Sequence, residues 1–198
     1  MTREGPNGSR RTVLALPTAL LCVVSGAAAA GGQFGSGGDR GVSYRVFKDP
    51  AGRFEIEYPT RDWRQAPISG STLVNFARTD GQAALSVESF RLADTLAPSE
   101  ILTMAEIEIQ DLKDRQSGAR NFTSEILDTK AGRGALIRYS RAGAKGPDLV
   151  MQYSIPVGLD LYRVIAVVPE ALAARHEPVV GHMILSFNAP APGGGSRQ

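Results

Sequence analysis

Short glycine-containing links between consecutive candidate strands constrain the fold of this chain most. Four candidate strands follow one another in the C-terminal half, and each link between them is a few residues long and contains glycine. Parallel strands need a crossover of a dozen or more residues, whereas antiparallel neighbours are joined by tight turns. The sequence therefore predicts an antiparallel meander whose strands cover residues 121–129, 135–141, 149–155 and 161–168.

Three further strands are predicted in the N-terminal half. The segment from Phe54 to Tyr58 alternates apolar and charged residues, which is the pattern of a half-buried strand, and Pro59 ends it. Residues 72–78 and 83–92 are the other two candidates. The Asp80-Gly81 pair between them supplies the positive φ that a hairpin turn needs.

Two helices complete the pattern. Pro98 can open the first helix, which ends before Gly118. The apolar residues of this helix recur at spacings of three and four: Ile101, Leu102, Ala105, Ile109 and Leu112. Residues 170–176 are compatible with a second helix, and we expect Pro178 to start a new turn there. That turn carries Val179, Val180, Met183, Ile184 and Phe187 on one face. An antiparallel sheet with two amphipathic helices on an apolar face is an α+β fold.

The first thirty residues have the order of an export signal. A basic head with Arg3, Arg10 and Arg11 precedes an apolar run over residues 13–24, and small residues up to Ala30 offer cleavage sites. The run is about half of the roughly 20 residues that a membrane span needs. The arginine pair also resembles the twin-arginine consensus. We expect cleavage near Ala30 and a periplasmic or extracellular product without a transmembrane span; an uncleaved signal that anchors the chain is the alternative.

Cysteine content and charge exclude several classes of protein. Cys22 is the only cysteine, so the chain has no intramolecular disulfide and no zinc site with two thiolates. Leu21 precedes it where a lipidated cysteine would follow Gly or Ala, which disfavours a lipoprotein. The chain has 22 basic and 20 acidic residues. Three of the basic residues and one of the acidic residues lie within residues 1–30. The remaining 19 of each sign make a neutral chain, which argues against nucleic-acid binding.

Glycine and proline mark the ends of the folded unit. Residues 31–41 are glycine-rich and are predicted to be a flexible linker. Residues 189–198 are rich in proline and glycine and are predicted to be a disordered tail. The folded domain is then expected over residues 42–188.

The candidate site residues do not specify a reaction or a metal. The first helix carries five carboxylates, which are predicted to form a solvated face because a hard-cation site needs oxygens that converge on one point: Glu100, Glu106, Glu108, Asp111 and Asp114. His176 and His182 are six residues apart, across Pro178, and are expected at the surface or in caps. Asp80 and Asp160 have local roles in turns. We therefore name no catalytic and no metal-binding residue.

Two other features have an ordinary structural explanation. Trp63 and Tyr58 could line a ligand pocket, but the prediction is that Trp63 closes the end of the first strand and packs against the core. The Asn121-Phe122-Thr123 triplet has the form of a glycosylation sequon, yet it is expected to lie within a strand.

Several short motifs together resemble one family. The segment from Tyr44 to Lys48, followed by Phe54-x-Ile56-x-Tyr58-Pro59 and then Trp63, resembles the opening of PsbP-like domains. Residues 161–164 resemble the penultimate strand of that family, and residues 184–187 resemble the end of its last helix. The resemblance covers residues 42–188. It implies an α-β-α sandwich around a central antiparallel sheet.

The resemblance also implies a type of function. It favours an exported, non-enzymatic domain that acts as a binding, accessory or assembly factor for an envelope protein or complex. The alternative is an extrinsic accessory protein of photosystem II in the thylakoid lumen, and calcium is expected as a cofactor only in that case. A third alternative is a hydrolase with a Ser–His–Asp set assembled from distant residues. The residues that would bind a partner or cofactor cannot be named from the motifs, because these lie at fold-forming positions.

Overall fold

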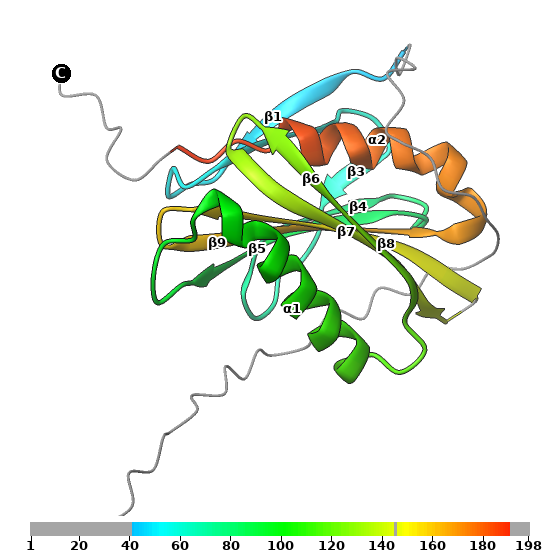
Figure 1. Ribbon diagram of the computed structural model, residues 1–198. Helices are drawn as coiled ribbons and strands as arrows, with labels where there is room; N and C mark the ends of the chain where they lie inside the picture. Colours follow the sequence, from blue (N-terminus) through cyan, green and yellow to red (C-terminus); the bar gives the residue numbers. More distant parts are fainter. Residues whose placement is uncertain (1–40, 145, 191–198) are drawn as a thin grey trace, which may run out of the picture.

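Seven strands form an antiparallel sheet at the centre of the molecule (Figure 1). The computed structural model describes residues 41–144 and 146–190. Two meanders make up the sheet, and they meet where β5 pairs with β9. In spatial order the strands are β3 (Trp63–Gln65), β4 (Thr72–Arg78), β5 (Ala84–Arg91), β9 (Asp160–Pro169), β8 (Gly146–Val157), β7 (Gly132–Gly143) and β6 (Arg120–Thr129).

A helix and a hairpin cover one face of this sheet. The helix is α2 (Ala173–Ser186), which follows the short 3-10 helix η2 (Glu170–Leu172). The hairpin pairs β1 (Tyr44–Lys48) with β2 (Glu55–Pro59) in a separate two-stranded sheet. Apolar side chains of α2, β2 and the sheet form one buried cluster, which includes Ile56, Phe76, Leu85, Tyr153, Ile155, Met183, Ile184 and Phe187.

The other face of the sheet is covered by α1 (Ile101–Arg115), so the two helices lie on opposite sides of the sheet (Figure 1). The 3-10 helix η1 (Pro98–Glu100) leads into α1, and Glu100 accepts a hydrogen bond from the backbone N–H of Ala97 at 2.6 Å. Ile101 and Ala105 are buried against residues of β7, β8 and β9. The molecule is therefore an α-β-α sandwich with a central antiparallel sheet, which confirms the predicted fold.

The seven predicted strands all occur, and their predicted turns join antiparallel neighbours. The strands β1 and β3 were not among those predicted. Both are short, with five and three residues, and most of their side chains are not buried. A strand with little burial shows little alternation of apolar and polar residues, so the pattern was too weak.

The prediction of a break at Pro178 was wrong, because α2 continues through this residue. A proline inside a helix has no N–H to donate to the carbonyl four residues earlier, which here belongs to Ala174. Both residues are exposed, so water can satisfy that carbonyl. Burial of Val180, Met183 and Ile184 holds the helix together on its other side.

The domain ends slightly later than predicted. Asn188 exchanges backbone hydrogen bonds with Glu55, and Ala189 is buried in the core, although it was assigned to the disordered tail. The rest of that tail after Pro190, the signal over residues 1–30, Cys22 and nearly all of the linker lie outside the described residues.

Candidate binding pocket

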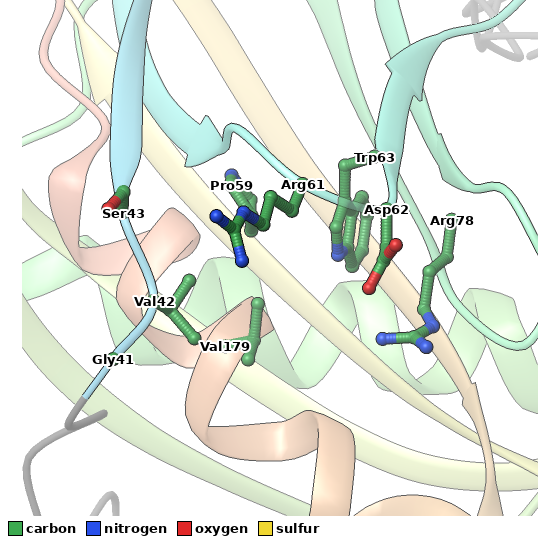
Figure 2. A pocket seen from close by; sticks show the side chains of 9 residues that line it. All are labelled: Gly41, Val42, Ser43, Pro59, Arg61, Asp62, Trp63, Arg78 and Val179. Carbon is green, nitrogen blue, oxygen red and sulfur yellow. The ribbon is translucent and has the colours of Figure 1, made fainter.

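A pocket of about 310 Å³ opens at the end of the molecule where the chain enters β1 (Figure 2). Its lining comes from the segment just before β1, the stretch from the end of β2 to the start of β3, the end of β4 and the middle of α2. The lining residues are Gly41, Val42, Ser43, Pro59, Arg61, Asp62, Trp63, Arg78 and Val179. A volume near 300 Å³ is at the lower end of the range for small-ligand sites.

Backbone hydrogen bonds fix the link between β2 and β3. The N–H and hydroxyl of Thr60 both donate to the carbonyl of Ser43, at 2.8 and 3.1 Å. Asp62 adopts a φ of 62°, a conformation in which Asp and Asn are enriched among residues other than glycine. Its carbonyl accepts the N–H of Thr79 at 2.7 Å. The link is thus tied to β1 on one side and to the turn after β4 on the other.

Trp63 forms the inner wall of the pocket and also belongs to the core. Its side chain is 5% exposed and packs in the same cluster as Phe76, which confirms the predicted core position. The register pairs Trp63 with Arg78, so both side chains lie on the same face of the sheet. In Figure 2 the nitrogen of the indole lies on the pocket side, and its N–H makes no hydrogen bond with a described residue.

Two arginines bring positive charge to the pocket from different elements. Arg61 is exposed, and it makes no ion pair or hydrogen bond with any described residue. Arg78 donates from Nε to Oδ2 of Asp80 at 2.8 Å, and no other described residue binds its guanidinium. Figure 2 shows the carboxylate of Asp62 between Trp63 and Arg78. The lining residues therefore carry two positive charges and one negative charge.

His176 lies on α2, one turn before the pocket residue Val179. The prediction that it is a surface or cap residue was wrong, because it is 2% exposed. Its Nε2 atom has no hydrogen-bond partner among the residues that the structure describes. Burial, followed by the charges of Arg78 and Arg175, lowers the pKa of the ring. The imidazole is therefore neutral near pH 7, and it adds no charge behind the pocket.

Glu108 departs from the predicted solvated face. It lies on the buried side of α1, where Oε2 accepts hydrogen bonds from Ser154 at 2.6 Å and from Gln152 at 3.0 Å. Its Oε1 accepts Nε of Arg163 at 2.8 Å, and the Arg163 guanidinium lies over the ring of Phe90. The helix tolerates this carboxylate in its core-facing position because donors of β8 and β9 satisfy both oxygens.

The other four carboxylates of that helix segment are not buried. Glu100 caps the helix, Asp111 pairs with Arg115 at 2.6 Å, and Asp114 accepts a hydrogen bond from Gln110 at 2.8 Å. These four carboxylates do not converge on one point. No group of three or more potential metal ligands occurs within the described ranges 41–144 and 146–190.

The remaining predicted residues lie elsewhere. Tyr58 stacks on Phe76 inside the core and does not line the pocket. His182 is partly exposed, and its Nε2 atom is hydrogen-bonded to Oε2 of Glu57 in β2 at 2.8 Å. Asp80 lies in the turn after β4, as predicted, and pairs with Arg78. Asp160 was predicted in a turn but is the first residue of β9, where it pairs with Arg91 of β5. The Asn121 triplet lies in β6, as expected.

Sequence reasoning found Trp63 but missed both arginines and Asp62. Arginines are common on protein surfaces, and the spacing of Arg61 and Arg78 along the chain shows no relation between them. Only the pairing of β3 with β4 brings Arg78 next to Trp63. A usable signal would have been the Arg61-Asp62-Trp63 triplet, which places charges directly beside the only tryptophan.

Comparison with solved structures identifies the class of fold. The chain is similar to the solution structure of cyanobacterial PsbP (CyanoP) from Synechocystis sp. PCC 6803, with a TM-score of 0.56 and 15% identity over 80% of this chain and 98% of that one. It is also similar to the crystal structure of LpqN, involved in cell envelope biogenesis of Mycobacterium tuberculosis, with a TM-score of 0.52 and 12% identity over 77% of this chain and 94% of that one.

The chain therefore has the fold of a PsbP-like domain, as its motifs indicated. No protein-family model and no curated protein matches the sequence. Among the residues that the structure describes, no helix is long and apolar enough to cross a membrane.

Proposed function

We propose that this chain is an exported PsbP-like domain that acts without catalysis and binds a protein or other component of the cell envelope. The observation that carries the proposal is the pocket beside Trp63, which four parts of the chain line and into which Arg61 and Arg78 present N–H groups that no described residue accepts. A convergent pocket with a few polar groups is the usual form of a recognition site.

Two further features support a role outside the cytoplasm. The first thirty residues have the pattern of an export signal. The fold is that of LpqN, which is described as involved in envelope biogenesis. A photosystem II accessory role is the second candidate, and the fold similarity to cyanobacterial PsbP favours it.

Site-specific crosslinking in the native cell tests the binding function. A photocrosslinking residue replaces Val42, which lines the pocket and is 36% exposed, and the control replaces Lys130 in the turn between β6 and β7. We expect a discrete crosslinked envelope product from position 42 that is absent from position 130. A photosystem subunit as the product would select the second candidate. Equal, diffuse crosslinking at both positions would refute the proposal.

Export and catalysis have their own tests. Residues 1–30 fused to a reporter that folds only outside the cytoplasm should give an active reporter, and mutation of the arginine pair should abolish it if the twin-arginine route is used. Turnover of any substrate by the purified protein, lost on substitution of Arg61 or Arg78, would contradict the non-catalytic role.

A further inference from the structure

The pocket beside Trp63 has an excess of hydrogen-bond donors. The guanidinium of Arg61 is exposed and unpaired, and Arg78 uses only Nε for its bond to Asp80. The indole N–H of Trp63 lies on the same side (Figure 2). The guanidinium of Arg61, the remaining N–H groups of Arg78 and the indole N–H of Trp63 therefore face one small cavity, and no described residue accepts them. A ligand that supplies acceptor oxygens would satisfy all three.

The charge of the lining limits what that ligand can be. Arg61 and Arg78 are positive, but Asp80 pairs with Arg78 and Asp62 is also negative, so the cation without an ion-pair partner among the described residues is Arg61. A ligand with a single negative charge pairs with it, whereas a dianion would leave an uncompensated charge near Asp62 and Asp80. Arginine presents its N–H groups in a planar fork that matches the two oxygens of a carboxylate.

Of the remaining lining residues, Ser43 is polar and the others are glycine or apolar. Val42, Pro59 and Val179 surround the cavity together with the ring of Trp63. Such a surface favours an aromatic or aliphatic body next to the charged group, because burial of apolar area is favourable. A free small anion such as acetate would leave this surface uncovered.

From these contacts we infer that the pocket binds a carboxylate attached to an apolar or aromatic body, with Arg61 and Arg78 on the carboxylate and Trp63 against the body. A C-terminal carboxylate that follows an apolar residue of a partner protein has this chemistry, and so does a free aromatic acid. The inference rests on the proposed binding function and names the group that its site recognises.

Trp63 makes the test specific, because it is the only tryptophan of the chain and lines the pocket. Its fluorescence is followed while the purified protein is titrated with N-acetylphenylalanine. The matched neutral probe is N-acetylphenylalanine amide, which keeps the body and removes the charge. Phenyl phosphate carries a dianion on a similar ring and tests whether the site prefers two negative charges. A peptide that ends in a phenylalanine with a free carboxylate tests whether the ligand is a protein C-terminus rather than a free acid.

We expect a saturable change with N-acetylphenylalanine and at least about tenfold weaker binding of the amide, as a charge-assisted hydrogen bond provides. Arg61→Gln and Arg78→Gln should each weaken carboxylate binding by about tenfold or more. Arg64→Gln is the matched control, because Arg64 is exposed on β3 and does not line the pocket. It should leave the titration unchanged.

Other outcomes would overturn the inference. Equal binding of acid and amide would show an apolar pocket without carboxylate recognition, and tighter binding of phenyl phosphate would show a dianion site. Absence of any saturable change up to millimolar probe would remove the site. Tighter binding of the peptide than of the free acid would instead support the inference and place the carboxylate on a protein terminus.

The two proposals can fail separately. Crosslinking from position 42 that survives in both Arg→Gln variants would keep the binding function and refute carboxylate recognition. Carboxylate binding without any crosslinked envelope product would keep carboxylate recognition and refute the envelope-binding function.

Discussion

Asp148 makes the stability of this domain depend on pH in a direction opposite to that of most carboxylates. Its side chain is 2% exposed, at the start of β8, and its Oδ1 atom has no hydrogen-bond partner. Oδ2 lies 3.9 Å from Nε of Arg141, which is too far for a hydrogen bond. Burial raises the pKa of Asp148 from 3.8 to about 6, because the charge of Arg141 offsets only part of the lost hydration.

The sign follows from linkage. A carboxyl whose pKa is higher in the folded state than in the unfolded state favours folding most at low pH, and that contribution is lost as the pH rises through the folded-state pKa. Here the loss spans about pH 4 to 7. A shift from 3.8 to about 6 corresponds to about 3 kcal/mol, at about 1.4 kcal/mol per pKa unit.

The substitution Asp148→Asn isolates this effect, since the amide is close in shape to the protonated acid and does not titrate. We expect the variant to gain about 3 kcal/mol relative to the wild type between pH 4 and 7.5, or about 6–12 °C in melting temperature. Urea unfolding followed by Trp63 fluorescence and circular dichroism across this range measures it.

The matched control is Asp128→Asn. Asp128 is exposed, and its hydrogen bond with Arg133 lowers the pKa of its carboxyl, so the difference from wild type should run in the opposite direction. A constant difference between wild type and Asp148→Asn at all pH values would refute the reasoning. The reasoning would also be refuted if the stability of the wild type rose relative to that of the variant with increasing pH, because the charge of Arg141 would then outweigh the effect of burial.

Three other substitutions test the packing. Glu108→Ala should cost about 3–5 kcal/mol in urea unfolding, because it leaves Arg163 without its buried carboxylate, whereas the exposed Glu106→Ala should change little. Gly134→Ala should destabilise by more than 1 kcal/mol, since a Cβ would lie 2.6 Å from a backbone carbonyl oxygen of β8; unchanged stability would mean that β8 can move. Pro178→Ala should raise the melting temperature, because a proline inside a helix costs about 3 kcal/mol through its missing N–H and the clash of its ring, against about 1 kcal/mol of unfolded-state entropy; a lower melting temperature would contradict this.

The sequence predicted the sheet better than it predicted the site, and the reason is physical. Alternation and short links depend on neighbours along the chain, so the strands and their antiparallel turns could be predicted. The pairing of β5 with β9 joins residues that are 69 to 83 positions apart in the sequence, and no local pattern encodes it. The missed strands β1 and β3 pair at the periphery, where little burial imposes a pattern.

Charged residues were the main source of error. Glu108 belongs to a helix with four other carboxylates, and only its position facing β8 and β9 separates it from them. His176 was expected at the surface or in a cap because it lies across Pro178 from His182. The helix continues through Pro178, and the side chain of His176 is buried. In both cases the partner or the burial comes from a distant element, so the local sequence is uninformative.

Hydrogen-bond capacity separates the groups that stabilise this domain from those that can bind a ligand. Both oxygens of Glu108 are occupied by protein donors, so the cluster around it contributes to the fold and offers nothing to a partner. His176 and Asp148 each have an unpaired atom, but both side chains are sealed from solvent. Arg61 and Arg78 differ from all three, because their unused N–H groups face an open cavity beside an apolar wall. Recognition is therefore expected at the pocket, while pH dependence is expected from the buried groups.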